Sequence, residues 1–284
     1  MYKIVDKREL APRIYEMRVA APKIAASALP GQFVIVRTDE KGERIPLTIC
    51  DFNKNDGTIT IVTQIVGYSS RQICNLEPGD SFADVAGPLG NPSDFVEMTD
   101  EEVRGHRWLF VAGGVGTAPV YPQVKWLRER GVEADVIIGA RTKELFSYVD
   151  EMRTVGNVYL CTDDGSLGFH GNVTQLMADL IDNQEKNYDR CVIIGPMIMM
   201  KFAAATAARY AIPSVVSLNA LMVDGTGMCG ACRVTVGGKT LFTCVDGPEF
   251  DGALVDYDEA MRRQNMYREN KKSHGPVDKC NCNG

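Results

Sequence analysis

The sequence has no long apolar run and no long basic run. Its first ten residues mix charged and apolar side chains, and no later segment approaches the roughly 18 uninterrupted apolar residues of a membrane-spanning helix. Lys and Arg total 31 against 37 for Asp and Glu, which gives a formal net charge of −6. Nucleic-acid binding requires a surface that neutralises phosphates, and this charge balance argues against it. We therefore expect a cytoplasmic protein that has neither a membrane nor a nucleic acid as partner.

Cysteine, in contrast, is abundant, with nine residues in 284. Hydrophobic residues make up 45% and charged residues 24%, which is enough apolar side chain to bury a core. Cytoplasmic thiols stay reduced, and an odd number of cysteines fits a disulfide framework poorly. We interpret the cysteines as metal ligands, buried small hydrophobic residues or both.

The first part of the chain, residues 1–98, consists of short β-branched and aromatic runs. They lie at 14–19, 32–37, 45–49, 58–66 and 81–85. Turn signals separate them, among them Pro30-Gly31 and Asn55-Asp56-Gly57. This pattern is typical of an antiparallel barrel or sandwich.

The pattern changes in the second part, residues 104–220. Continuous apolar runs at 108–112, 134–139, 157–161, 190–195 and 214–218 alternate with helix-compatible segments. Such alternation predicts a parallel sheet with helices on both faces, and the polar stretch 94–107 marks the boundary before it. Residues 221–252 form a third part rich in glycine and cysteine. Residues 253–284 predict a helix and a frayed tail, although Cys280 and Cys282 in that tail could bind a metal.

The strongest motif lies in the third part. Cys229, Cys232 and Cys244 follow the spacing of plant-type ferredoxins, whose two-iron cluster is held by Cys-x4-Cys-x2-Cys and a distant fourth Cys, and Asp224 stands where the first Cys is expected. The intervening glycines suit a backbone that wraps around inorganic sulfide. A zinc site and simple packing are the alternatives, but structural zinc sites more often use Cys or His at all four positions. Water or Thr226 could also replace Asp224 as the fourth ligand.

A second motif is the glycine-rich stretch 113–119, which joins a predicted buried strand to a helix. Small residues there let the backbone approach a pyrophosphate at the helix amino terminus, although a Pro replaces the third glycine of the usual fingerprint. Residues 195–197 form another small-residue turn at the same predicted sheet edge. In the first part, the Thr48 hydroxyl could bond a flavin ring and residues 67–70 could hold a diphosphate; each is as compatible with ordinary turn chemistry.

In this order, the parts resemble the ferredoxin-reductase superfamily: a flavin-binding barrel, a nicotinamide-binding α/β domain and a small carboxyl-terminal [2Fe–2S] module. Up to about residue 272 the chain is similar to the electron-transfer subunits of dihydroorotate dehydrogenases. It is more similar to the small subunits of electron-bifurcating NADH-dependent ferredoxin:NADP oxidoreductases. The dihydroorotate-type subunits use four cysteines for the cluster, whereas the bifurcating ones use one Asp and three Cys, as here.

The resemblance implies the cofactors FAD, a [2Fe–2S] cluster and NAD(H), and a heterodimer with a larger flavin and iron–sulfur subunit that handles NADPH and ferredoxin. It implies cluster ligation by Asp224, Cys229, Cys232 and Cys244. The implied flavin contacts are Arg44, Pro46, Leu47, Thr48, Val62, Thr63, Gln64, Gly67, Ser69 and Ser70. The implied nicotinamide contacts are Gly113, Gly114, Gly116, Thr117, Ala118, Pro119, Gly139, Ala140, Arg141, Asp163, Asp164, Gly165, Gly195, Pro196 and Met197.

Cofactors then carry the chemistry, and no catalytic side chain is predicted; Thr48, near the flavin N5 edge, is the nearest candidate. The three histidines, His106, His170 and His274, are expected to be surface or structural residues. Arg141 and Lys143 could favour NADP, whereas the acidic pair at 163–164 and the resemblance favour NAD(H). The competing functions are an electron-transfer subunit of an NAD-linked dihydroorotate dehydrogenase and a non-catalytic, zinc-stabilised binding module.

Overall fold

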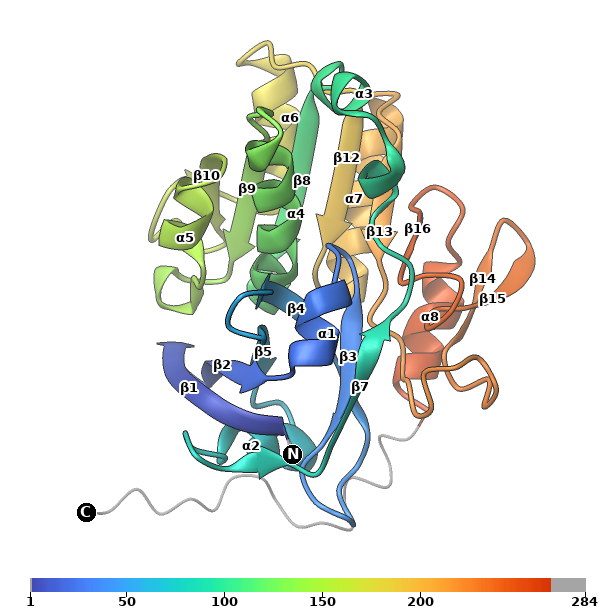
Figure 1. Ribbon diagram of the computed structural model, residues 1–284. Helices are drawn as coiled ribbons and strands as arrows, with labels where there is room; N and C mark the ends of the chain where they lie inside the picture. Colours follow the sequence, from blue (N-terminus) through green and yellow to red (C-terminus); the bar gives the residue numbers. More distant parts are fainter. Residues whose placement is uncertain (1, 267–284) are drawn as a thin grey trace.

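The computed structural model describes residues 2–266 and contains two seven-stranded sheets and a small hairpin (Figure 1). The first sheet is antiparallel and the second is mostly parallel, and a compact carboxyl-terminal module lies beside both. The expected fold class, a β-barrel followed by an α/β domain and a small third module, is confirmed.

The antiparallel sheet has the strand order β6-β1-β2-β5-β4-β3-β7. The bounds are β1 (Tyr2–Ala11), β2 (Ile14–Ala20), β3 (Phe33–Arg37), β4 (Ile45–Asn53), β5 (Thr58–Gln64), β6 (Ser81–Phe82) and β7 (Asp84–Leu89), with helices α1 (Pro22–Ser27) and α2 (Tyr68–Cys74). The two end strands, β6 and β7, follow one another almost directly in sequence, so the sheet curls into a nearly closed barrel. Inward-facing side chains such as Met17, Val34 and Ile61 fill it.

The second sheet has the order β11-β10-β9-β8-β12-β13-β16, parallel except for β16. Its strands are β8 (Trp108–Gly113), β9 (Asp135–Ala140), β10 (Asn157–Thr162), β11 (Phe169–His170), β12 (Arg190–Ile194), β13 (Ser214–Ser217) and β16 (Glu249–Asp251). The helices around it are η1 (Asp94–Glu97), α3 (Asp100–Arg104), η2 (Gly114–Gly116), α4 (Thr117–Glu129), η3 (Lys143–Leu145), α5 (Val149–Arg153), α6 (Val173–Asp182) and α7 (Met197–Arg209).

Side-chain alternation gives this sheet two buried faces. On β8, Leu109 and Val111 pack with α6 and α7, while Phe110 and Ala112 pack with α4. Figure 1 shows α4 on one face of the sheet and α6 and α7 on the other. From β8 the strands β9 to β11 extend to one side of the sheet, and β12 and β13 extend to the other, so the strand order reverses between β8 and β12. Open α/β sheets bind ligands at the carboxyl ends of the strands at such a point.

The third module consists of the cysteine-containing loops, the hairpin β14 (Arg233–Val236) and β15 (Lys239–Phe242), and helix α8 (Tyr257–Gln264). Between the hairpin and α8, its chain joins the large sheet, because β16 pairs with β13. Among residues 2–266, no helix is long and apolar enough to cross a membrane. Cys280, Cys282 and His274 lie outside the described residues.

A buried carboxyl group joins the three parts. Glu249 of β16 accepts hydrogen bonds from the Ser93 hydroxyl (3.0 Å), which follows the barrel, and from the Gln123 amide of α4 (2.8 Å). Burial raises the pKa of Glu249 to about 7, against the opposing effect of the two hydrogen bonds. A second contact between barrel and α4 is the ion pair of Lys125 with Asp51 (2.9 Å).

We expect Glu249→Gln to remove a pH dependence of stability. Because the pKa of Glu249 rises from 4.5 to about 7 on folding, the folded protein holds the proton more tightly, so the free energy of unfolding should fall as pH rises through that window. Above pH 7 the variant should be more stable than wild type by about 1–3 kcal/mol. Between pH 4.5 and about 7, its free energy of unfolding should lack the decrease that Glu249 causes in wild type. Denaturant unfolding at several pH values measures this. Glu97→Gln, at an exposed carboxyl, is the control, and equal pH profiles for Glu249→Gln and wild type would contradict the prediction.

Candidate functional site

The loop that carries Asp224 is organised around that carboxylate. One oxygen accepts hydrogen bonds from the backbone N–H groups of Met228 (3.2 Å) and Cys229 (3.3 Å), and the other accepts one from the Thr226 hydroxyl. The Thr226 hydrogen bond, followed by the backbone donors, lowers the pKa of Asp224. The carboxylate is therefore held in its charged form, next to the exposed Cys229.

The other two predicted ligands form a buried pair. The Cys232 and Cys244 sulfur atoms lie 3.3 Å apart, and each residue is 2% exposed. Burial and the neighbouring Cys232 raise the pKa of the Cys244 thiol, whereas a hydrogen bond from the Gly227 backbone opposes the shift. That backbone donor gives the loop an N–H group directed at sulfur.

Two of the predicted ligands, Cys232 and Cys244, thus form a buried pair, whereas Asp224 is half-buried and Cys229 is exposed. Within the part of the chain that the structure describes, no three His, Cys, Asp or Glu side chains gather closely enough to hold a single metal ion. A closed zinc site needs four ligands around one point, whereas a two-iron cluster spreads four ligands over two metals. Three Cys and one Asp, with backbone N–H groups directed at the Cys244 sulfur and at the Asp224 carboxylate, are a donor set that suits a two-iron cluster.

Glycine is required where this loop meets the barrel. Gly225 has φ +83°, and a Cβ there would lie 2.7 Å from Ile35 and 2.8 Å from Leu89. Phe33 and Ile35 of β3 share an apolar cluster with Met222 and the thiols of Cys232 and Cys244. The cysteine-containing module therefore packs directly on the outer face of β3.

The predicted flavin residues of β4 lie on the same outer face. In the β3–β4 pairing, Thr48 is opposite Phe33 and Pro46 is opposite Ile35. Paired residues point to one side of a sheet, whereas the intervening Leu47 packs with the barrel core. Pro46 and Thr48 are thus one strand away from the side chains that contact the cysteines.

The remaining predicted flavin residues have mixed environments. Ser70 caps α2, accepting hydrogen bonds from the Val66 and Gly67 backbone at 2.9 Å each. The Ser69 hydroxyl bonds Glu43. Thr63 has a buried hydroxyl without a hydrogen-bond partner among the described residues, on the barrel side of β5 next to the half-buried Gln64.

Two predicted flavin residues make contacts that the sequence did not indicate. Val62 of β5 shares an apolar cluster with Val115 and Ala118 of the glycine-rich turn, which packs the barrel against the second sheet. Arg44 donates a hydrogen bond from Nε to the Val223 carbonyl (2.6 Å) and pairs with Asp84 (3.2 Å).

The predicted nicotinamide residues gather at the carboxyl edge of the parallel sheet. Gly113 is paired with Gly139 on β9, and a Cβ on Gly116 would lie 2.9 Å from the Cα of Gly195. Ala140, Arg141, Asp163, Asp164 and Gly165 follow at the ends of β9 and β10, with the Asp164 N–H bonded to the Arg141 carbonyl at 3.3 Å. Thr117, Ala118 and Pro119 begin α4, and Pro196 and Met197 begin α7.

Most glycines of this edge are explained by packing against protein atoms. A Cβ on Gly116 would lie 2.3 Å from the Ile194 carbonyl oxygen, one on Gly139 2.4 Å from Val173, and one on Gly113 2.3 Å from the Met199 sulfur. Gly114 is different, since its φ is +56° and no atom lies within 4 Å of a Cβ built there. Gly114 is therefore the position at which the backbone is open to a ligand.

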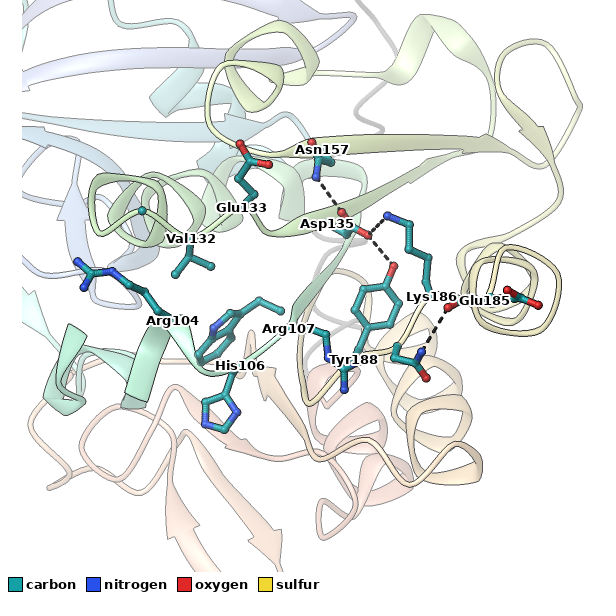
Figure 2. A pocket seen from close by; sticks show the side chains of 13 residues that line it. Arg104, His106, Arg107, Val132, Glu133, Asp135, Asn157, Glu185, Lys186 and Tyr188 are labelled. Carbon is teal, nitrogen blue, oxygen red and sulfur yellow. Dashed lines mark hydrogen bonds and ion pairs between the residues drawn. The ribbon is translucent and has the colours of Figure 1, made fainter. Parts of the chain in front are cut away.

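A cleft of about 510 Å³ lies at the opposite, amino edge of the sheet (Figure 2). At its centre, buried Asp135 accepts hydrogen bonds from Tyr188 (2.8 Å) and Asn157 (3.1 Å) and pairs with Lys186 (3.2 Å). Arg107 in its wall pairs with Asp189. These polar groups satisfy one another's hydrogen-bonding capacity. The cluster therefore ties together the amino ends of neighbouring strands. Sequence reasoning missed it, although an Asp opening an apolar strand was a visible signal.

The cysteines outside the motif are packing residues where the structure describes them. Cys50, Cys74, Cys161 and Cys191 are all buried. Burial raises the pKa of the Cys74 thiol to about 11 and that of Cys161 to about 12. His170 is exposed and His106 packs edge-on against Trp108, in keeping with the structural roles expected for them.

Comparison with known proteins defines the class first. The fold is shared with the Amycolatopsis cytochrome P450 reductase GcoB (TM-score 0.61, 17% identity, 73% of this chain and 65% of that one). It also matches a structure of an NADH-dependent reduced ferredoxin-NADP oxidoreductase, studied for flavin-based electron bifurcation (TM-score 0.88, 42% identity, 96% of each chain).

The family follows from sequence relatives. Residues 219–256 match the model of the iron-sulfur cluster binding domain of dihydroorotate dehydrogenase B. A Thermotoga maritima homologue of the dihydroorotate dehydrogenase B (NAD(+)) electron transfer subunit is 45% identical over 95% of this chain and 92% of its own length. The Geobacillus thermodenitrificans electron transfer subunit is 34% identical, over 89% and 96%. This chain belongs to the family of dihydroorotate dehydrogenase B electron-transfer subunits and their homologues.

We expect Gly114→Ala and Gly116→Ala to differ in stability. The new methyl group at Gly116 would press on the Ile194 backbone and should lower the free energy of unfolding by about 3 kcal/mol. At Gly114 it would meet no protein atom and should cost about 1 kcal/mol of left-handed backbone strain. Denaturant unfolding of both variants measures the difference, and equal losses would contradict the assignment of Gly114 as the open position.

Proposed function

We propose that this chain is the small, electron-transfer subunit of an electron-bifurcating NADH/ferredoxin/NADP(H) oxidoreductase. It carries FAD in the barrel, binds NAD(H) at the carboxyl edge of the parallel sheet and holds a [2Fe–2S] cluster in the third module. When bound, the flavin supplies the exchange between a two-electron hydride and single electrons that the cluster can carry. The protein residues hold these groups in place, in the order in which electrons pass between them.

One observation carries the proposal: the cysteine module and the Pro46–Thr48 stretch occupy one outer face of the barrel. Phe33 and Ile35 contact the buried thiol pair on one side and are paired with Thr48 and Pro46 on the other. A flavin ring against Thr48 would therefore lie next to the module that holds the cluster, without intervening solvent-exposed chain. Family membership and the 42% identity to the bifurcating oxidoreductase support the same function.

The residues then have distinct roles. Asp224, Cys229, Cys232 and Cys244 ligate the two irons, with the carboxylate already ordered by backbone donors. Gly114 brings its backbone close to the pyrophosphate of NAD(H). Pro46 and Thr48 orient the flavin ring. NAD(H) is favoured over NADP(H) because Asp163 and Asp164 stand at the end of β10, where a 2′-phosphate would be repelled.

The partner is a larger catalytic subunit. The family's electron-transfer subunits imply such a partner, and the Asp ligand favours the NADPH- and ferredoxin-handling type. A dihydroorotate dehydrogenase is the second candidate, favoured by the names of the sequence relatives. Co-purification from native cells followed by mass spectrometry separates the two, since recovery of a dihydroorotate dehydrogenase would overturn the bifurcating assignment.

The test of the proposed function is reduction of the purified chain by NADH under anaerobic conditions. We expect flavin absorbance to bleach first and the cluster signal to follow, with NADPH at least about tenfold slower, which corresponds to about 1.4 kcal/mol of discrimination. Equal rates with both nucleotides would contradict the NAD(H) assignment. A colourless chain that binds one zinc would overturn the function altogether.

Asp224→Cys tests the ligand set. We expect the variant to keep a two-iron cluster, with a changed visible spectrum and a lower midpoint potential, because a thiolate donates more electron density to iron than a carboxylate does. Redox titration followed by electron paramagnetic resonance measures both. Thr226→Val is the matched control, since it removes only a hydrogen bond to the carboxylate. If Thr226→Val alters the spectrum and Asp224→Cys does not, Asp224 is not a ligand.

A further inference from the structure

We propose that Arg44 is a positioning residue for the loop that carries Asp224, which we call the cluster loop. Arg44 links this loop to β4, and its charge raises the reduction potential of the cluster. The inference rests on the proposed function, because it concerns residues that would hold the cluster. It differs from the flavin contact that the family resemblance implies for Arg44.

The contacts of Arg44 point to the cluster loop. Nε donates a 2.6 Å hydrogen bond to the carbonyl oxygen of Val223, and one terminal nitrogen lies 3.2 Å from the Asp84 carboxylate on β7. A guanidinium has donors in a fixed planar fork, so holding one side on Asp84 orients the other toward Val223. Arg44 itself immediately precedes β4, the strand of Pro46 and Thr48.

The bonded carbonyl belongs to the peptide group that carries the N–H of Asp224. The Val223 side chain is 47% exposed and contributes little packing, whereas Met222 before it and Gly225 after it are packed against the barrel cluster of β3 and β7. The peptide between these two anchor points can rotate unless its carbonyl is fixed. Arg44 fixes it, and thereby the direction in which the Asp224 side chain leaves the backbone.

The charge of Arg44 matters as well as its geometry. Arginine carries a positive charge under all ordinary conditions, and the Arg44 side chain is 30% exposed, so solvent screens its field incompletely. A positive charge beside a group that gains an electron stabilises the reduced form. The negative charge of Asp84 offsets part of this effect. The hydrogen bond to the Val223 carbonyl holds the guanidinium beside Asp224, so the remaining positive charge acts at that end of the loop.

The experiment compares Arg44→Gln, Arg44→Lys and the control Arg18→Gln in the full chain. Arg18 lies on β2 and has a weak ion pair with Asp6 (3.9 Å), so its variant makes the same charge change away from the loop. Each protein is assayed for flavin, iron and sulfide content, cluster midpoint potential, the electron paramagnetic resonance spectrum of the reduced cluster, and the rate of iron release to a chelator.

We expect Arg44→Gln to lower the cluster potential, broaden the resonance spectrum and release iron several-fold faster, with flavin content unchanged. Arg44→Lys should keep most of the potential but share the broadened spectrum, because it retains charge and loses the planar fork. Arg18→Gln should match wild type in all readouts, and Arg44→Lys keeps the test valid if Arg44→Gln fails to fold.

Two results would overturn the inference. One is an Arg44→Gln cluster with the potential and spectrum of Arg18→Gln. The other is loss of flavin with an unchanged cluster, which would make Arg44 a flavin contact, as the family resemblance implies. Wild-type protein that assembles no cluster at all would instead refute the proposed function, so the two failures are distinguishable.

Discussion

The pairing of β3 with β4 is the constraint on which the arrangement of sites depends. Because side chains alternate across a strand, the barrel core takes Val34 and Val36, and Phe33 and Ile35 are left on the outside. The register then aligns Thr48 and Pro46 with them. A shift of one residue would turn Thr48 into the barrel and bring Leu47 out. The Thr48 side chain would then no longer lie on the same face as the cysteine module.

The cysteine module, in turn, is built to lie on this face. Its thiol pair is buried against β3, while Asp224 is half-buried and Cys229 is exposed, so the module has an inner end at the barrel and an outer end toward solvent. In the proposed function, electrons pass between these ends. The two ends also differ in chemistry: the inner end holds two buried thiols, and the outer end holds a carboxylate and an exposed thiol. If a two-iron cluster binds here, this difference would let the protein tune its two irons separately.

Sequence periodicity was sufficient for the architecture and less so for the contacts. The alternating and continuous apolar runs located most strands of both sheets, because burial on one or two faces writes itself directly into the pattern. Strand β1 was missed, since Asp6, Lys7 and Arg8 make it look like a charged segment, and its pairing with β2 compensates for that composition. The ligand spacing around Asp224 was visible because cluster-binding loops are local in sequence. The contact of Arg44 with Val223 spans 179 positions, and no local pattern carries it.

The glycine-rich turn shows why a motif needs the structure for its interpretation. Counted in the sequence, its glycines are equivalent, yet Gly116 is required by the Ile194 backbone, and Gly113 leaves room for Met199. Only Gly114, of the three, combines a left-handed backbone with open space. The size of a cleft is similarly misleading. The large cleft around Asp135 is lined by polar groups that already satisfy one another, whereas the carboxyl edge gathers small residues at the reversal of strand order. Ligand binding requires polar groups or backbone that the fold leaves available, and in this sheet Gly114 at the carboxyl edge provides such backbone.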